Sequence, residues 1–218
     1  MKLKKPQLNK NLELLSEDFQ SYIRRVQEEE DCISHKLISN VNLNGMDLSR
    51  LEFNDVLFQN CRFIGCDFEN AGFVDVRFEN CDLSNCHIEN GYFSRCEMSS
   101  CKMMGTDFRS STWKHTKFSD CNMRFINLDH AKMDVVMMEE VDAEHANLTE
   151  CKLAHLELNN VKMNQASFFR TPLKGINFTK AQIAGITVSD SYQELQGAVI
   201  DAYQAADLVK LLGVVIDS

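Results

Sequence analysis

The chain has 218 residues, 25% of them charged, and a formal net charge of −9 at pH 7. This acidic balance disfavours a nucleic-acid ligand and favours a basic partner. No run of 18 apolar residues exists, which excludes a membrane-spanning helix, and residues 1–30 lack the apolar core of a signal peptide, so we expect a cytoplasmic protein.

Residues 1–37 are predicted to form an N-terminal helical cap. After Pro6, apolar residues recur at helical spacing: Leu8, Leu12, Leu15, Phe19, Tyr22, Ile23 and Val26. The acidic run 28–31 would end this helix, and Ser16, Glu17 and Asp18 form a start signal that can divide it into two. We interpret the segment as a cover for the open end of the region that follows. The alternative is a helix that binds a partner.

Residues 38–190 follow a period of five, which matches neither an amphipathic helix nor an alternating strand. From Leu43 to Val188, every fifth residue is apolar, and we call this position the centre. The 30 centres are 11 Phe, 8 Leu, 6 Met, 2 Ile and one each of Trp, Val and Ala. Two residues before each centre stands a small or apolar residue, and none of these 60 sites carries a charge.

The repeat region resembles the pentapeptide-repeat family, whose pattern is A-(D/N)-L-X-X. Close matches are Asp-Leu at 47–48, Cys-Asp-Phe at 66–68, Cys-Asp-Leu at 81–83, Thr-Asp-Phe at 106–108 and Ala-Asn-Leu at 146–148. The resemblance implies an all-β fold: a right-handed, quadrilateral parallel β-helix with four pentapeptides per coil. With a marginal first repeat at Ile38, about 7.75 coils would stack into a rod of about 37 Å.

Residues 191–218 leave the period and are predicted to form a C-terminal helix and tail. A helix is expected over Ala202–Leu212, closed by Gly213, with a short β-type run at 214–216. This segment resembles the C-terminal end of the Qnr group of pentapeptide-repeat proteins, which implies a twofold homodimer of about 75 Å. The expected dimerisation residues are Tyr203, Leu208, Leu211, Leu212, Val214, Val215 and Ile216. The alternative is a monomer capped by its own helix.

The cysteines and histidines are interpreted as structural and surface residues. Eight of the nine cysteines stand at the small inward position, where a thiol replaces alanine. We therefore predict no metal site, no disulfide and no cofactor. The six histidines lie off the inward positions, and no catalytic motif or phosphate-binding loop is present. We predict that the chain is not an enzyme and has no catalytic residues.

Acidic residues concentrate on two opposite sides of the predicted rod, because residues four pentapeptides apart stack on one face. The face through Leu48 carries 8 acids against 3 bases, and the face through Phe58 carries 6 against 3, whereas the other two faces are nearly neutral. The candidate partner-binding residues are Asp47, Asp67, Glu69, Glu89, Asp107, Asp129, Glu139 and Glu140.

The resemblance to the Qnr group implies a function. Similar rods are proposed to imitate duplex DNA, so the expected partner is DNA gyrase or topoisomerase IV, with an effect on quinolone sensitivity. Some Qnr proteins carry loops needed for protection, and this chain has none between residues 38 and 190, so the resemblance favours binding over protection. The alternatives are a general interaction scaffold with an unrelated partner and an immunity protein against a gyrase-targeting toxin.

Overall fold

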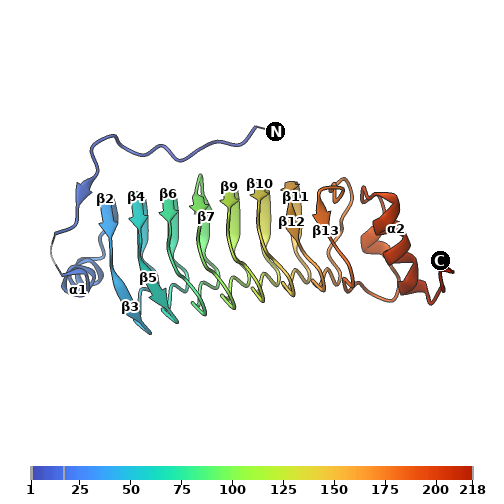
Figure 1. Cartoon of the computed structure of the whole chain (residues 1–218). Helices are drawn as coiled ribbons and strands as arrows, with labels where there is room; N and C mark the ends of the chain where they lie inside the picture. The colour runs from blue at the N-terminus through green and yellow to red at the C-terminus, as the bar shows by residue number, and fades with distance from the viewer. Residues whose placement is uncertain (1, 17, 218) are drawn as a thin grey trace.

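The backbone winds into a rod of stacked coils in which each strand pairs in parallel with the segment four pentapeptides further on (Figure 1). Phe53 is paired with Phe73, and Met133 with Leu153, at this same offset. Four pentapeptides therefore complete one coil, and about eight coils stack between residues 33 and 190. This computed structural model describes residues 2–16 and 18–217. It is the predicted right-handed quadrilateral parallel β-helix.

Strands occupy two of the four sides of each coil almost continuously. The long strands on these sides are β2 (Ile33–Ser39), β4 (Glu52–Gln59), β6 (Gly72–Glu79), β9 (Thr112–Ser119), β10 (Lys132–Glu139) and β11 (Lys152–Asn159), with β7 (Tyr92–Ser94) and β8 (Glu97–Ser99) as a divided pair. The other two sides contain β3 (Asn42–Asn44), β5 (Arg62–Ile64), β12 (Val161–Lys162), β13 (Ala181–Gln182) and single bridges such as Asp47 to Asp67.

The corners of the coil are made by one residue in every five. From His35 to Arg170, each fifth residue has a φ between 52° and 69°, which is the left-handed region. Asn, Gly and Asp tolerate this conformation at low cost, and they fill many of these positions. Val135 and Phe125 also adopt it, although bulky side chains rarely do.

The interior is a column of apolar layers. The rings of Phe73 and Phe93 stack with centroids 4.7 Å apart, and Phe93 stacks on Trp113 at 3.8 Å, with nearly parallel planes. The eight cysteines predicted to point inward are all buried. Seven of these thiols donate to carbonyls of the preceding coil, as Cys96 Sγ does to Phe73 O at 3.3 Å, whereas Cys66 Sγ donates to Ile64 O. Burial raises the pKa of Cys96 to about 12.

A hydroxyl can replace the thiol at the small position. Thr106 Oγ1 donates to Leu83 O at 2.7 Å and Thr171 Oγ1 donates to Leu148 O at 2.5 Å, in both cases to the coil that precedes it along the chain. Cysteines at this position donate to the equivalent carbonyl, 23 residues earlier in the chain, as Cys96 does to Phe73 O. This agreement supports the structural interpretation of the cysteines.

The N-terminal segment is only partly helical, so the prediction of helical structure from Leu8 to Leu15 was wrong. Helix α1 (Phe19–Glu29) begins at its N-cap Asp18 and ends at Glu30, which is left-handed, and it buries Phe19, Tyr22, Ile23 and Val26 against the first coil. The preceding residues are extended, because strand β1 (Glu13–Leu14) pairs with the open edge of β2 and satisfies backbone groups there.

The C-terminal helix was predicted correctly. Helix α2 (Ala202–Val209) continues as the 3-10 helix η2 (Lys210–Leu212) and is closed by left-handed Gly213, and a further 3-10 helix, η1 (Gln193–Leu195), precedes it. The expected β-type run at 214–216 belongs to no strand. No helix in the described part of the chain is both long and apolar enough to cross a bilayer.

The ladder extends beyond both ends of the predicted repeat region. Ile33 already pairs with Phe53, and Asn177 pairs with Val199, slightly out of the register of four pentapeptides. The division into residues 1–37, 38–190 and 191–218 remains a prediction.

Candidate functional site

The Leu48 face is the side of the rod formed by residues 46–50 and every fourth pentapeptide after them. On this face the residue before the centre has a structural function in most repeats. Asp47 Oδ1 accepts a hydrogen bond from Ser49 N at 2.9 Å, Asp67 Oδ1 from Glu69 N at 2.8 Å and Asp107 Oδ1 from Arg109 N at 3.1 Å. These contacts are Asx turns, in which a short polar side chain closes the backbone turn.

Asparagine performs the same function further along this face. Asn127 and Asn147 accept the equivalent backbone hydrogen bonds from Asp129 and Thr149. The turn therefore requires an acceptor oxygen and not a charge. The negative charges of Asp47, Asp67 and Asp107 are available for another purpose.

The acids of the Leu48 face differ in how far they are neutralised. Arg109 bridges Glu89 at 2.9 Å and Asp107 at 2.8 Å. Within the residues that the structure describes, Asp47, Asp67 and Glu69 take part in no ion pair. The hydroxyl and amide of Ser49 lower the pKa of Asp47, which keeps this carboxylate charged. Carboxylates without an ion pair therefore lie on the coils nearest α1, where the charge of Arg50 also acts on Asp47.

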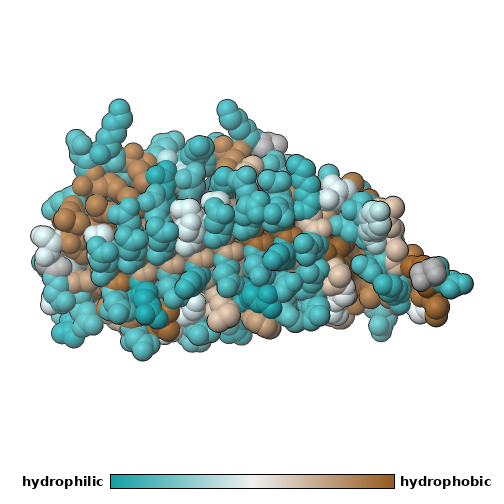
Figure 2. All heavy atoms as spheres, in the orientation of Figure 1, coloured by the Kyte–Doolittle hydropathy of each residue, from teal (hydrophilic) through white to brown (hydrophobic). Residues whose placement is uncertain are grey.

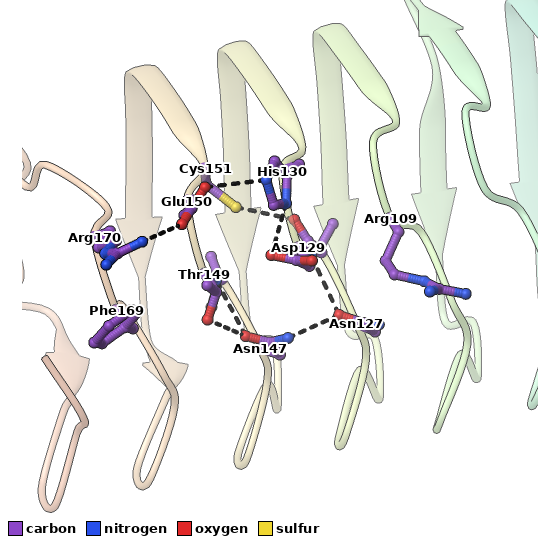
Figure 3. A network of polar contacts seen from close by, with 12 residues as sticks. Arg109, Asn127, Asp129, His130, Asn147, Thr149, Glu150, Cys151, Phe169 and Arg170 are labelled. Atoms are coloured by element: carbon purple, nitrogen blue, oxygen red, sulfur yellow. Dashed lines mark hydrogen bonds and ion pairs between the residues drawn. The ribbon is translucent and has the colours of Figure 1, made fainter. Parts of the chain in front are cut away.

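The later coils of the Leu48 face form a mixed network (Figure 3). His130 lies between Asp129 at 2.9 Å and Glu150 at 3.0 Å, and Arg170 contacts Glu150 at 3.1 Å. Arg170 also lies over the ring of Phe169, with 5.0 Å between its guanidinium carbon and the ring centroid. This end of the face presents both signs of charge and an aromatic ring.

The Phe58 face is formed by residues 56–60 and the pentapeptides stacked on them. Lys117 Nζ lies 2.8 Å from Glu139 and lowers the pKa of this carboxyl. Glu140 accepts a hydrogen bond from Asn160 Nδ2 at 2.5 Å. Of the two predicted binding residues on this face, Glu139 is thus partly compensated and Glu140 is exposed at a corner.

The remaining sides are balanced by neighbouring pairs. On the side through Leu43, Arg62 lies 3.8 Å from Asp82, and Arg124 contacts Asp142 at 3.3 Å and Glu144 at 2.5 Å. Opposite charges alternate along this side, so its field falls off quickly.

The predicted dimerisation residues divide into two groups. Leu208 packs against the hydrophobic core and Leu211 is half-buried, so both help to dock α2 on the coil of the same chain. Tyr203, Leu212, Val214, Val215 and Ile216 are exposed, Val215 by 91%. Figure 2 shows hydrophobic atoms gathered at this C-terminal tip, whereas polar atoms cover most of the visible side.

Two residues that the sequence analysis did not single out close the last coil. Gln204 is buried, and its Nε2 donates to Phe178 O at 2.8 Å and Ala181 O at 2.7 Å. Glu194 accepts from Arg170 N at 2.8 Å and from Ser189 N at 3.1 Å. Burial alone would raise the pKa of Glu194, but these hydrogen bonds lower it below its usual value. No pattern in the sequence separates these two residues from other polar residues of the turn and the helix, such as Gln193 and Asp207.

The comparisons with known proteins concern the same coil. A model of the pentapeptide repeat region matches residues 71–148 and 91–168, and a model of pentapeptide repeats in nine copies matches residues 38–97. No curated protein matches the sequence significantly.

Several solved structures are similar to this chain. Trypsin-treated QnrB1, described as a plasmid-mediated fluoroquinolone resistance protein, is 23% identical, with 84% of this chain and 90% of that chain covered and a TM-score of 0.47. Full-length QnrB1 is 16% identical, with coverage of 82% and 100% and a TM-score of 0.33. HetL, from the cyanobacterium Nostoc sp. strain PCC 7120 and described as involved in heterocyst differentiation regulation, is 14% identical, with coverage of 82% and 91% and a TM-score of 0.29.

The fivefold rhythm, the coil offset of four pentapeptides and the matches of two repeat models agree. Together the models cover residues 38–168, which is more than half of the sequence. The chain therefore belongs to the pentapeptide-repeat family.

Proposed function

We propose that this chain is a dimeric, non-catalytic binding protein that presents its acidic faces to the basic DNA-binding surface of DNA gyrase or topoisomerase IV. It would act in the cytoplasm, compete with DNA for that surface, and thereby change the sensitivity of the enzyme to fluoroquinolones. The resemblance of its C-terminal segment to the Qnr group supports this choice of partner.

The observation that carries the proposal is the distribution of charge over the four sides. Asp47, Asp67 and Glu69 take part in no ion pair among the described residues, although the turns at 47 and 67 require only an acceptor oxygen. The side through Leu43 uses the same turns but pairs its acids with Arg62 and Arg124. Negative charge that is concentrated on one side of the rod attracts a basic partner toward that side.

The strength of the field sets the expected degree of competition. A DNA duplex of about 37 Å carries about 22 phosphate charges, whereas this chain has a net charge of −9. We therefore expect binding that weakens with salt, but with a shallower slope than DNA binding to the same enzyme.

Dimerisation would double the length of the acidic surface. The exposed apolar group at the C-terminal tip has no covering element in the described chain, and two copies joined there would form a rod of about 75 Å. A twofold interface requires a self-complementary surface, and the exposed apolar side chains of Tyr203, Val214 and Val215 are candidates for it.

The test is a supercoiling and cleavage assay with purified gyrase, with and without ciprofloxacin. The variant Asp47→Asn, Asp67→Asn, Glu69→Gln should bind gyrase about tenfold more weakly, equivalent to about 1.4 kcal/mol. The matched control is Asp82→Asn, Asp142→Asn, Glu144→Gln, which removes the same charges from the same repeat positions on the side through Leu43. The control should bind within about twofold of the wild type, and thermal melting should show both variants folded.

The other outcomes separate the alternative functions. Equal weakening by both variants would contradict the assignment to the Leu48 face. A wild-type protein that leaves supercoiling and drug-stabilised cleavage unchanged would contradict the proposed partner. Relief of a peptide toxin that targets gyrase would then favour an immunity protein, and no such relief would favour a scaffold for an unrelated partner.

A further inference from the structure

The N-terminal strap, residues 2–12, lies outside both the coil and α1. Figure 1 shows it running from β1 alongside the coils toward the opposite end of the rod. It follows the corner between the side through Phe53 and the Phe58 face. This corner is formed by the left-handed residues His35, Asp55, Asp75, Arg95, His115, Val135 and His155.

The strap buries one corner of the rod and leaves the others open. Asp55, Asp75 and Val135 are 6%, 7% and 5% exposed, and Arg95 and His115 are half-buried. At the next corner, each residue at the same five levels is exposed: Asn60, Asn80, Ser100, Asp120 and Glu140. The strap therefore covers about five coils.

Two backbone hydrogen bonds tie the described strap residues to this corner. Gln7 N donates to Asp75 Oδ1 at 2.9 Å, and Asn9 N donates to Asp55 Oδ1 at 2.7 Å. Asp75 is also held by Arg95 through Nε at 2.7 Å, and Asp55 by His35 Nδ1 at 2.5 Å. The corner carboxylates thus have fixed positions and accept hydrogen bonds from the main chain of an extended segment.

The side chains of the strap divide into half-buried apolar residues and exposed lysines. Leu3, Pro6, Leu8 and Leu12 are half-buried toward the coil, whereas all four lysines of the strap are exposed: Lys2, Lys4, Lys5 and Lys10. Near the free end, Lys2, Leu3 and Lys5 line a hollow of about 380 Å³ together with Val135 and Glu157. The strap is a lysine-rich segment with no acidic residue, bound beside an acidic face.

We propose that this corner is a docking track for an extended, lysine-rich peptide segment, and that the strap is its internal occupant. The strap shields the edge of the Phe58 face, so a basic partner gains full access to this face only when the strap leaves the corner. The inference rests on the proposed function in that the partner is basic, and it adds the means by which access is regulated.

The size of the regulation follows from the open fraction of the strap. The apparent affinity for a competing segment equals its intrinsic affinity multiplied by the fraction of molecules with an open corner. The amides of Gln7 and Asn9 report this fraction directly, because each is protected from hydrogen exchange only while its aspartate accepts its hydrogen bond.

The experiment uses the full-length protein and a labelled peptide of ten lysines. Saturating peptide should abolish exchange protection at Gln7 and Asn9. The variant with Lys2, Lys4, Lys5 and Lys10 changed to Gln should show a larger open fraction, and its peptide affinity should rise by the same factor, about threefold to tenfold. The matched control changes Lys102, Lys132, Lys152 and Lys162 to Gln, which are exposed and do not line the hollow beside the strap. It has the same net charge and should keep the wild-type open fraction.

Gyrase provides the second arm and separates the two proposals. The track is contradicted if the peptide binds with Gln7 and Asn9 still protected, if it does not bind, or if both quadruple variants bind it equally. If the peptide displaces the strap but gyrase binds no form of the protein, the proposed function fails and the track stands. If gyrase binds all forms equally with the strap protected, the track fails and the proposed function stands.

Discussion

At the scale of single residues, each position of the pentapeptide has its own physical function. The centre fills the layer, and the small position leaves room for it. A Cys or Thr at the small position can also donate to a carbonyl of the preceding coil, as Cys96 and Thr106 do. One residue in every five adopts the left-handed conformation at a corner. The aspartate or asparagine before the centre closes the turn, as Asp67 and Asn127 do. Because these functions use different atoms, sequence variation at the solvent positions changes charge without changing the fold.

The ring column gives the first prediction. Phe73 is fully buried and stacks on both Phe53 and Phe93, so Phe73→Ala leaves a cavity between layers and should lower the free energy of unfolding by about 3–5 kcal/mol. Phe125→Ala is the control, because Phe125 is 52% exposed and the same truncation there should cost less than about 1 kcal/mol. Urea unfolding followed by circular dichroism measures both. Equal losses would contradict a layered core.

Asp75 gives a pH-dependent prediction. Burial would raise the pKa of Asp75, but hydrogen bonds from Arg95 and Gln7 lower it below the usual 3.8. A lowered pKa in the folded state contributes stability above the unfolded value, and this contribution is lost as the pH falls through the folded value. Asp75→Asn should therefore cost about 1–3 kcal/mol at pH 7.

The cost of this substitution should shrink when urea unfolding is repeated at falling pH below about 3.8, because the unfolded chain is protonated there and the folded carboxylate takes up its proton only at a lower pH. Asp120→Asn is the control, because Asp120 is an exposed corner residue. A cost for Asp75→Asn that stays constant with pH would show that the charge of Asp75 has no part in it.

At the scale of elements, each end of the coil has backbone groups and an apolar layer that no further coil covers, and the two ends cover them differently. At the N-terminus, β1 adds a strand to the open ladder and α1 covers the first layer with Phe19 and Ile23. At the C-terminus, the side chains of Glu194 and Gln204 satisfy backbone groups that no further coil would satisfy.

Gln204→Leu tests the C-terminal cap. The change removes the donor of Ala181 O and one of the two donors of Phe178 O, which keeps only the amide of Ala181, so the free energy of unfolding should fall by about 1–3 kcal/mol. Hydrogen exchange should also become faster across α2. Gln196→Leu is the control at an exposed position. If exchange in α2 were unchanged in Gln204→Leu, the helix would be held by its apolar contacts alone.

The coil could be predicted from sequence because a period of five, sustained without interruption from Leu43 to Val188, leaves one architecture. The strap could not, because Leu8, Leu12 and Leu15 fit the spacing of a helix face as well as that of an extended segment against the coil. Asparagines at the corners were an available signal for the left-handed turns. The sequence could not show which acids are paired with a base, because Arg109 contacts both Glu89 and Asp107 only through its side-chain conformation.

At the scale of the whole molecule, the exposed C-terminal tip determines the expected assembly. Val215→Asp places a charge in the proposed twofold contact, where its image in the second copy repels it, so the protein should become a monomer in light scattering. Phe125→Asp is the control, because it adds the same charge to another exposed apolar side chain and should remain a dimer. A dimeric Val215→Asp variant would contradict assembly through the tip.

Because the offset between paired segments is always four pentapeptides, the rod can change in length while each side chain stays on the same face. Deletion of residues 96–115 would shorten the rod by one coil, and every later side chain would stay on its original face. Excising only 96–100 would turn everything downstream by a quarter revolution, and Asp129 would pass to an adjacent side. Tandem duplication of four pentapeptides at a time is thus a route by which such a chain can lengthen while its surface residues stay aligned on the same faces.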